Sequence, residues 1–414
     1  MAEINGRASP WRWVVLGAFM LVNFIIQVLW ICYAPISAEA AKLYGVSELS
    51  IGFFAMLFMI AYVPLSVPVA WLIDRFGFKN MVILGSAIMT LSALARGLAG
   101  SSYVLALVGT IGLSVSQPFF LNAWTKMPAH WHPQGERATA VGLITLSNLV
   151  GIAVGMALTP QLAQSMSIPN IQLVYAAAAL VAGLVFALVA REYPKIPVGP
   201  MGSGEKALMI EGLKEALASP SFRLLCIVAF VVLGLFNGVN TWIEAIVSSR
   251  GLSASDAGTI GAIILGGGII GAVLLPALSD RSGLRLPWLI VGIVGAIPAI
   301  LGLAFFANQL LIMISAFFYG FFLTSILPVG MQYSTEVTRP VPEGTTGGLI
   351  QLAGQASVVF VFLMDVVRGP SRSFNPALVL SAILLALSAV LVGFMKEAPK
   401  AETGATAAAP KARS

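Results

Sequence analysis

The stretch that decides the fold is a short charged turn, Asp74-Arg75-Phe76-Gly77-Phe78-Lys79, which returns 206 residues later as Asp280-Arg281-Ser282-Gly283-Leu284-Arg285. Each copy separates two long apolar stretches. The same offset relates glycines on both sides of the turn, in the pairs Gly45 and Gly251, Gly52 and Gly258, and Gly142 and Gly348. Because self-similarity at one fixed offset indicates an internal repeat, the chain is predicted to contain one structural unit twice.

The sequence around these turns has the composition of a membrane protein. Hydrophobic residues make up 58% of the 414 residues and charged residues only 10%, whereas a soluble domain carries about 25% charged residues. Uncharged apolar stretches of about 20 residues, long enough to cross a bilayer, occur twelve times, at 13–36, 51–73, 81–100, 103–124, 138–162, 171–190, 224–247, 257–279, 287–308, 310–333, 345–367 and 377–395. The chain is therefore predicted to be an all-α integral membrane protein with twelve transmembrane helices.

The position of the repeat divides these spans into two halves. Six spans, an even number, separate the two copies of the turn, so the copies are parallel repeats about an axis along the membrane normal. We expect two pseudo-symmetric six-helix bundles, 1–190 and 224–396, joined by a cytoplasmic linker loop at 191–223 and followed by a disordered cytoplasmic tail at 397–414. Within the linker, 204–218 is expected to form a short amphipathic helix.

The placement of Lys and Arg predicts the orientation. Of 23 basic residues, 18 fall in the N-terminal segment, the even-numbered loops or the C-terminal tail. Because basic loops stay on the cytoplasmic side, both termini are expected in the cytoplasm of a multi-pass cell-membrane protein. The net charge of +6 does not indicate nucleic-acid binding, since the basic residues occur one to three at a time between apolar runs.

The first span also has features of a cleaved signal peptide, because Ala38-Glu39-Ala40 resembles a cleavage site. Its apolar core is longer than the roughly 7–15 residues of a signal peptide, and the repeat gives it a partner in the second half. We therefore expect a transmembrane helix. Cys32 and Cys226 both lie within apolar runs, so no disulfide framework is indicated.

Each residue of the charged turns has a local physical reason. A carboxylate at a helix boundary accepts hydrogen bonds from free backbone N–H groups and interacts well with the positive end of the helix dipole. Asp74 and Asp280 are therefore expected to cap the helix that follows each turn. Gly77 and Gly283 permit a tight turn, and the basic residue two positions further on favours the cytoplasmic side.

The two turns resemble the motif of the major facilitator superfamily, G-x-x-x-D-R-x-G-R/K, found between helices 2 and 3 and again between helices 8 and 9. Here Ala70 and Pro276 stand at the leading glycine. The resemblance covers essentially residues 10–396. It implies alternating access, with the halves rocking about a central site and the turns acting as conformational latches through Asp74, Arg75, Gly77, Lys79, Asp280, Arg281, Gly283 and Arg285.

Polar residues inside the predicted spans are candidates for a substrate site, because such groups are costly in a membrane unless they have partners or a function. The alternative is that these amides hydrogen-bond one helix to another. Several share a helix face by their spacing, and some lie on spans that line the cavity in the superfamily. The candidates are Asn23, Gln27 and Trp30 in span 1, Gln117 in span 4, Asn237, Asn240, Thr241 and Glu244 in span 7, and Gln351 and Gln355 in span 11.

The charges of the spans restrict the substrate. No Lys or Arg occupies the middle of any span, which argues against an anionic substrate and favours a small organic cation or zwitterion. Trp30 then offers a cation–π surface, or it simply packs between helices. Glu244 is the most deeply placed acid, since Asp365 and the base Arg96 lie near outer span ends.

Glu244 has two interpretations. It is a candidate for proton or cation coupling, because an ionisable group inside a membrane protein is usually functional. Alternatively it forms an ion pair with Arg250, which lies one or two helical turns away near the outer side.

Longer strings resemble the feline leukaemia virus subgroup C receptor-related branch of the superfamily, solute carrier family 49, whose members carry choline and ethanolamine and have been linked to haem. These strings are WICYAPIS at 30–37, YGVS at 44–47, YVPLSVPVAWLIDRFG at 62–77, SVSQPFFL at 114–121 and LPVGMQYSTEVTRPVPEGTTGGLIQLAGQ at 327–355.

Position by position, the resemblance implies that the cation-facing tryptophan of the branch is Trp30, its span-4 glutamine Gln117 and its span-11 glutamine Gln355. Where the branch has a second aromatic residue, a tyrosine in span 7, this chain has Asn237. Half of the aromatic box is therefore missing unless Phe236 or Trp242 replaces it.

Two further patterns have simpler explanations. Gly266-x-Gly268-x-x-Gly271 matches a dinucleotide fingerprint, but it lies inside an apolar span, so helix packing through Gly267 and Gly271 is expected. His130-Trp131-His132 lacks Cys or carboxylate neighbours at metal-ligand spacing, so we expect a cytoplasmic loop there and no metal. Motifs of hydrolases, metalloproteases and ATPases do not occur, so we expect neither an enzyme nor a cofactor.

Taken together, the sequence predicts a monomeric secondary active or facilitative transporter for a small organic cation or zwitterion, with the substrate and the lipid bilayer as its partners. A proton-coupled exporter with Glu244 as proton carrier is the first alternative. It is suggested by Gly142, Gly151 and Gly155, spaced as in drug:proton antiporters, although Met156 replaces the proline of that motif. A non-transporting receptor is the second alternative.

Overall fold

The computed structural model describes residues 9–124, 126–194, 210–338, 341, 343–368 and 373–397, and its regular structure over these ranges is helical. Twelve helical segments in these ranges are long and apolar enough to cross a membrane, which confirms the predicted fold class. The N-terminal half contains α1 (Trp11–Ile31), η1 (Ala34–Ile36), α2 (Ser37–Tyr44), α3 (Glu48–Phe76), α4 (Phe78–Gly97), α5 (Tyr103–Leu121), α6 (Lys126–Trp131), α7 (Gln134–Ala163) and α8 (Ile168–Val189).

The second part of the chain begins with a helix in the predicted linker and continues with a second set of long helices. It contains α9 (Ile210–Ala218), α10 (Pro220–Thr241), α11 (Ile243–Ser248), α12 (Ala254–Ser282), α13 (Leu286–Phe305), α14 (Gln309–Val337), α15 (Glu343–Ala356), α16 (Val359–Val367) and α17 (Asn375–Gly393). Helix α9 confirms the short helix expected before span 7. The domain boundaries expected from the sequence stay predictions, and the tail beyond residue 397 lies outside the described residues.

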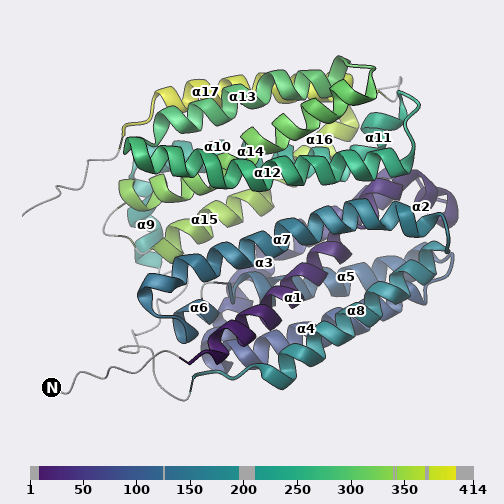
Figure 1. Ribbon diagram of the computed structural model, residues 1–414, viewed down its shortest axis with the longest axis horizontal. Helices are drawn as coiled ribbons and strands as arrows, with labels where there is room; N and C mark the ends of the chain where they lie inside the picture. The colour runs from purple at the N-terminus through teal and green to yellow at the C-terminus, as the bar shows by residue number, and fades with distance from the viewer. Residues whose placement is uncertain are drawn as a thin grey trace, which may run out of the picture.

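The two halves lie side by side, with α7 of the first half facing α12 of the second (Figure 1). Helices α2 and α11 lie at one end of the molecule, and α6 and α9 lie at the other (Figure 1). We call the end with α2 and α11 the closed end, and it also includes the first turns of α3 and α12. The second is the turn end, which includes Gly77 and Gly283. This arrangement places the repeated turns at the same end of both halves.

Two helices in corresponding places of the halves, α1 and α10, end and resume near the closed end. Helix α1 ends at Ile31, and a short 3-10 turn containing Pro35 leads into α2. Helix α10 ends at Thr241, and Trp242 separates it from α11. The eleventh span, which was expected to be continuous, is divided into α15 and α16. The first span is correspondingly longer than predicted, because helical structure resumes after the Pro35 turn and continues to Tyr44.

The expectation that Asp74 and Asp280 cap the following helices was wrong. Gly77 (φ 83°) and Gly283 (φ 66°) end α3 and α12 in backbone conformations that favour glycine. Both aspartates lie before these glycines, in the last turn of the preceding helix. The free N–H groups of α4 and α13 therefore need other acceptors.

One glutamate from the end of each half supplies these acceptors. Glu192 accepts hydrogen bonds from the backbone N–H groups of Phe78 and Lys79 at 3.0 and 2.8 Å. Glu397 accepts from those of Arg285 and Leu286 at 2.6 and 3.1 Å. The chain segment after the last helix of each half thus caps the helix that directly follows the repeat turn, α4 in the first half and α13 in the second.

The glycines of the apparent dinucleotide fingerprint are packing residues. A methyl group at Gly267 would meet the carbonyl oxygen of Phe317, and one at Gly271 would meet that of Phe321. Both partners belong to α14, which packs closely along α12. The expected role of Gly267 and Gly271 in helix packing is confirmed, because side chains at these positions would force the two helices apart.

Candidate functional site

Trp30 lies near the end of α1 and is fixed through its polar edge. Its indole N–H donates a hydrogen bond of 3.1 Å to the carbonyl oxygen of Ala55 in α3, and the residue is buried. A buried tryptophan normally satisfies its N–H in this way, which leaves the ring as an apolar surface. The orientation of the ring is therefore set jointly by α1 and α3.

The two amides that share a face with Trp30 are also buried. Asn23 donates to the carbonyl oxygen of Phe19 at 2.9 Å, one turn earlier in α1, and its Oδ1 accepts no hydrogen bond. Gln27 lies against Gly151 of α7, where the absence of a side chain allows close packing of the helices. The first span thus has an unpaired acceptor in Asn23.

Helix α10 shows the same arrangement in the other half. Asn240 donates to the carbonyl oxygen of Phe236 at 2.8 Å, while its Oδ1 is buried without a donor. Asn237 is half-buried and Thr241 is buried. The interior of α10 therefore also has an amide oxygen with unused hydrogen-bonding capacity.

Glutamines from two further helices complete the candidate set. Gln117 in α5 is buried, and its Oε1 has no donor. Gln351 and Gln355 in α15 are half-buried. Helix α5 contacts α1, and α15 contacts both α10 and α3. Among the residues that the structure describes, no hydrogen bond joins these candidate side chains to one another, so the amides are not a helix-to-helix network.

The two possible replacements for the missing aromatic residue lie in different surroundings. Trp242 is fully buried at the closed end, and its indole N–H donates to the carbonyl oxygen of Val361 at 2.9 Å. Its ring packs against Gly52 of the other half. Phe236 is half-buried, and it stands at the repeat position of Trp30, 206 residues later.

Glu244 joins the two halves at the closed end. Its carboxylate accepts a hydrogen bond from the Ser37 hydroxyl at 2.8 Å and one from the Ala38 backbone N–H at 2.9 Å, in the first turn of α2. Burial raises the pKa of the Glu244 carboxyl, and Glu39 and Glu48 raise it further, while these two hydrogen bonds oppose the shift. The site is therefore a carboxylate of one half bound to a helix N-terminus of the other.

The predicted alternative of an ion pair between Glu244 and Arg250 was wrong. Arg250 donates instead to the carbonyl oxygen of Ala304 at 2.6 Å and to the side chain of Asn375 at 3.2 Å. These acceptors lie at the end of α13 and the start of α17. Arg250 thus ties helices of its own half together.

Other contacts between the halves also lie at the closed end. Arg368, after α16, forms an ion pair with Glu48 of α3 at 3.1 Å and another with Asp365 at 3.3 Å. Gln161 of α7 donates to Ser255 of α12 at 3.0 Å. Sequence analysis did not identify these residues, because each is an ordinary polar residue near a loop and gains its role only from its partner in the other half.

At the turn end the predicted latch residues contact groups of their own half. Lys126, the first residue of α6, forms an ion pair with Asp74. The Arg75 guanidinium lies 5.2 Å from the centre of the Trp71 ring and 5.4 Å from that of Phe76. In this structure the first turn is therefore held by α3 and by the residue that begins α6.

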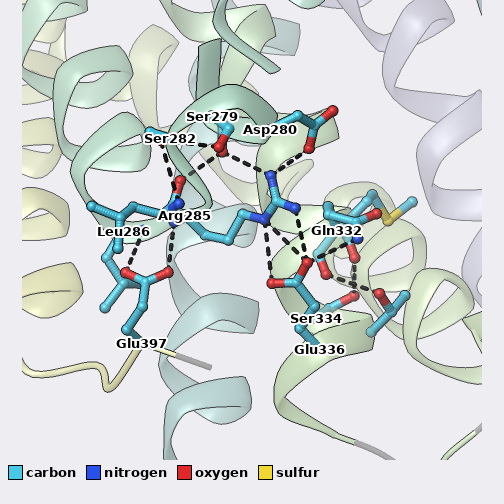
Figure 2. Close-up of polar contacts among 12 residues, drawn as sticks. Ser279, Asp280, Ser282, Arg285, Leu286, Gln332, Ser334, Glu336 and Glu397 are labelled. Atoms are coloured by element: carbon cyan, nitrogen blue, oxygen red, sulfur yellow. Dashed lines mark hydrogen bonds and ion pairs between the residues drawn. The ribbon is translucent and has the colours of Figure 1, made fainter. Parts of the chain in front are cut away.

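The second turn centres on Arg285 (Figure 2). Its guanidinium binds Asp280 at 2.5 Å and Glu336 of α14 at 2.9 Å, and its own backbone N–H binds Glu397. Arg281 is exposed. The Glu192 and Glu397 caps repeat at an offset of 205 residues, so the repeat itself was a sequence signal that could have revealed them.

The predicted loop at His130 is a short helix, α6. The His130 imidazole stacks on the Tyr193 ring, with ring centres 4.7 Å apart, and lies 3.6 Å from the carboxylate of Glu192. Over the described ranges, no three His, Cys, Asp or Glu side chains gather in a way that could bind a metal ion.

Comparisons with known proteins agree with the twelve-helix architecture. The chain matches the Major Facilitator Superfamily over residues 19–362 and 251–413. A solved structure of a bacterial homologue of the human lysosomal transporter Spinster, inward-facing and unoccupied, aligns with a TM-score of 0.77 and 17% identity, over 93% of this chain and 97% of that one.

Curated relatives belong to the solute carrier 49 branch. The choline/ethanolamine transporter FLVCR2 of Rattus norvegicus is 28% identical over 418 residues, or 94% of this chain and 75% of that protein. Solute carrier family 49 member A3 of Danio rerio is 26% identical over 391 residues, or 90% of this chain and 82% of that protein. The match over most of the chain, the repeated turns and the two six-helix halves lead to one conclusion: this protein belongs to the Major Facilitator Superfamily.

Proposed function

We propose that this protein is a secondary carrier that moves a small organic cation or zwitterion of the choline and ethanolamine class across the membrane by alternating access. The observation that carries the proposal is the set of buried amide oxygens without donors at Asn23, Gln117 and Asn240, on helices of both halves. An ammonium, hydroxyl or polarised methyl group is the natural partner of such acceptors. The names of the relatives FLVCR2 and FLVCR1 support the same substrate class.

The aromatic part of the proposed site comes from Trp30 and Phe236. The indole N–H of Trp30 is already bound to Ala55, so its ring is available for a cation–π contact. Phe236 replaces the tyrosine of the branch from the repeat position in α10. Gln27, Asn237, Gln351 and Gln355 complete the polar lining.

The structure corresponds to one state of the transport cycle. The halves are joined at the closed end through Glu244 and the pair of Arg368 with Glu48. At the turn end, Asp74 and Arg285 bind within their own halves. We assign the turn end to the cytoplasm from its excess of Lys and Arg, which makes this an inward-facing state. The turns then act as latches in the opposite state, when the halves meet at the turn end.

The remaining predictions form part of the same proposal. The two bundles are 1–190 and 224–396, with the linker at 191–223 and the tail at 397–414. Both termini lie in the cytoplasm, the protein resides in the cell membrane as a monomer, and it moves its substrate without chemical conversion. A thiol reagent that does not cross membranes should label a cysteine introduced at Lys214, in the linker helix, only after the cells are opened.

Uptake into proteoliposomes tests the substrate class. Radiolabelled choline and ethanolamine should enter vesicles that contain the protein, and unlabelled choline should compete with both. Protein-free vesicles and an organic anion of similar size are the controls. Transport of the anion but of neither amine would overturn the proposal.

A proton-coupled exporter is the second candidate, and Glu244 is the observation in its favour. Its carboxylate is buried between the halves and would be released whenever the closed end opens. Gly151 and Gly155 support this candidate less, because both pack directly against α1. A pH gradient that drives export in the parent but not in Glu244→Gln would favour the exporter, and choline uniport without response to the gradient would exclude it.

A further inference from the structure

Arg96 is a charged residue that the proposed site does not use. It lies in the last turn of α4, is fully buried, and forms no ion pair with any carboxylate in the described part of the chain. A guanidinium in such surroundings is costly unless specific groups receive its hydrogen bonds. The identity of those groups therefore indicates its role.

Over the described ranges, the hydrogen bonds and the ring contact of the guanidinium all go to residues 29–33. Its Nη2 donates to the carbonyl oxygen of Leu29 at 3.0 Å and to Sγ of Cys32 at 3.4 Å. Its central carbon lies 5.1 Å from the centre of the Tyr33 ring, in cation–π geometry. Residues 29–33 are the segment in which α1 ends.

This segment needs such a partner. The last four carbonyl groups of a helix receive no hydrogen bond from an N–H group of the same helix. Leu29 lies near the end of α1 and is buried within the bundle. A positive charge also interacts favourably with the negative end of the α1 dipole. Gln172 of α8 supports the same segment, since its amide donates to Sγ of Cys32 at 3.5 Å.

The position of Trp30 follows from these contacts. Trp30 directly follows Leu29, and its own indole N–H is bound to Ala55 of α3. Trp30 is thus held at its backbone, through the hydrogen bond of Arg96 to the preceding Leu29 carbonyl, and at its ring, through the hydrogen bond to Ala55 of α3. Beyond Tyr33, the chain leads through η1 to Ser37 and Ala38, the partners of Glu244.

We propose that Arg96 is the positioning residue for Trp30: by holding residues 29–33 to α4, it fixes the tryptophan at the cation site without touching the substrate. The inference rests on the proposed function in one respect, namely that Trp30 contacts the substrate. Its structural part, the anchoring of residues 29–33, is testable without any substrate.

The chain contains two cysteines, Cys32 and Cys226, so Cys226→Ser leaves Cys32 as a single reporter inside the anchored segment. In this background, Arg96→Met should increase the rate of Cys32 alkylation by N-ethylmaleimide about tenfold, because a charged hydrogen bond is lost without loss of side-chain volume. Arg250→Met is the matched control, since it removes an arginine–carbonyl bond that does not involve α1. Equal rates in the Arg96→Met variant and its parent would overturn the inference.

Transport kinetics test the link to Trp30. Arg96→Met should raise the KM for choline about tenfold and change kcat little, and Arg96→Lys, which keeps the charge and a donor, should restore part of the affinity. In a Trp30→Ala background, Arg96→Met should have no further effect on KM. Additive effects would show that Arg96 acts on stability alone. If the parent does not transport choline while Arg96→Met still exposes Cys32, the proposed function fails and the anchor stands.

Discussion

At the level of single residues, the proposed site combines one fixed ring with acceptors that have no donor. Trp30 is the clearest case, because its N–H is bound to Ala55 and only its ring remains for a ligand. The oxygens of Asn23, Gln117 and Asn240 are buried without donors. A buried acceptor without a donor costs roughly 1–3 kcal/mol, so in the proposed site a ligand with an ammonium or hydroxyl group would recover part of this free energy.

Replacement of Trp30 by Ala should weaken choline binding about tenfold, the order expected for the loss of a partly desolvated cation–π contact. Competition against labelled choline in detergent solution measures the affinity. Trp30→Phe is the control, since it keeps an aromatic ring and should retain most of the affinity. Unchanged binding by Trp30→Ala would reduce Trp30 to a packing residue.

Glu244 predicts a pH dependence of the closed end. Burial raises its pKa above the ordinary value of 4.5, whereas opening exposes the carboxyl and lets the pKa fall back. The closed state therefore binds the proton more readily. Protonation of Glu244 stabilises the closed state most strongly at a pH below the ordinary pKa of 4.5. This stabilisation is lost as the pH rises through the raised pKa of the closed state.

Choline exchange at equal pH on both sides of the vesicle should consequently become faster as the pH rises above about 4.5. Glu244→Gln should remove this part of the pH dependence, because glutamine still accepts from Ser37 and Ala38 but does not titrate. The nearby carboxylates Glu39 and Glu48 remain in the variant, so a profile that is identical in both proteins would assign the dependence to them.

At the level of helices, the hydropathy pattern located the spans but not their interruptions. The breaks after Ile31, at Trp242 and before Val359 lie inside stretches that hydropathy predicts as single spans. Hydropathy measures transfer into lipid and carries no information on helix continuity. The breaks place the candidate residues Trp30 and Glu244 near helix ends.

Helix packing also explains which glycines tolerate substitution. Gly267→Ala should destabilise the protein by roughly 1–3 kcal/mol, since the new methyl group would meet the Phe317 carbonyl. The neighbouring Gly266 has open space around it, so Gly266→Ala should be neutral or slightly stabilising. Thermal unfolding in detergent compares the two variants, and equal midpoints would contradict the close packing of α12 on α14.

At the level of the whole molecule, the repeat gives the two sides of the closed end equivalent geometry but different chemistry. On one side Gln161 binds Ser255 through an uncharged hydrogen bond. On the other, Arg368 binds Glu48 as an ion pair. Glu244 lies between them and binds Ala38, its own repeat mate 206 residues earlier, so this contact crosses the pseudo-twofold axis.

Covalent linkage across the closed end should stop transport. The double variant Gln161→Cys and Ser255→Cys, treated with a short bifunctional methanethiosulfonate, should lose choline exchange because the closed end can no longer open. Reduction with dithiothreitol should restore it. Each single cysteine variant, treated in the same way, is the control. Full exchange in the linked protein would show that the transport cycle does not require separation of α7 from α12.

The sequence by itself determined the fold class, the twelve spans, the repeat and the family. These features depend on local hydropathy, on charge placement and on a motif that recurs at a fixed offset, all of which can be read without knowing which segments touch. The twelve apolar helices confirmed the fold class, and the match to the Major Facilitator Superfamily confirmed the family. The candidate residues of the site were also chosen in this way, and their roles stay predictions.

Only the tertiary structure decided the partners. Asp74 and Asp280 were expected to cap helices, but Glu192 and Glu397 do so from more than 100 residues away in the chain. Glu244 binds α2 of the other half rather than its neighbour Arg250, and Arg96 holds the end of α1 across 67 residues. The physical reason is common to all these cases: a buried polar group pairs with whatever donor or acceptor the packing of distant helices places within about 3 Å, and no local sequence pattern encodes that placement.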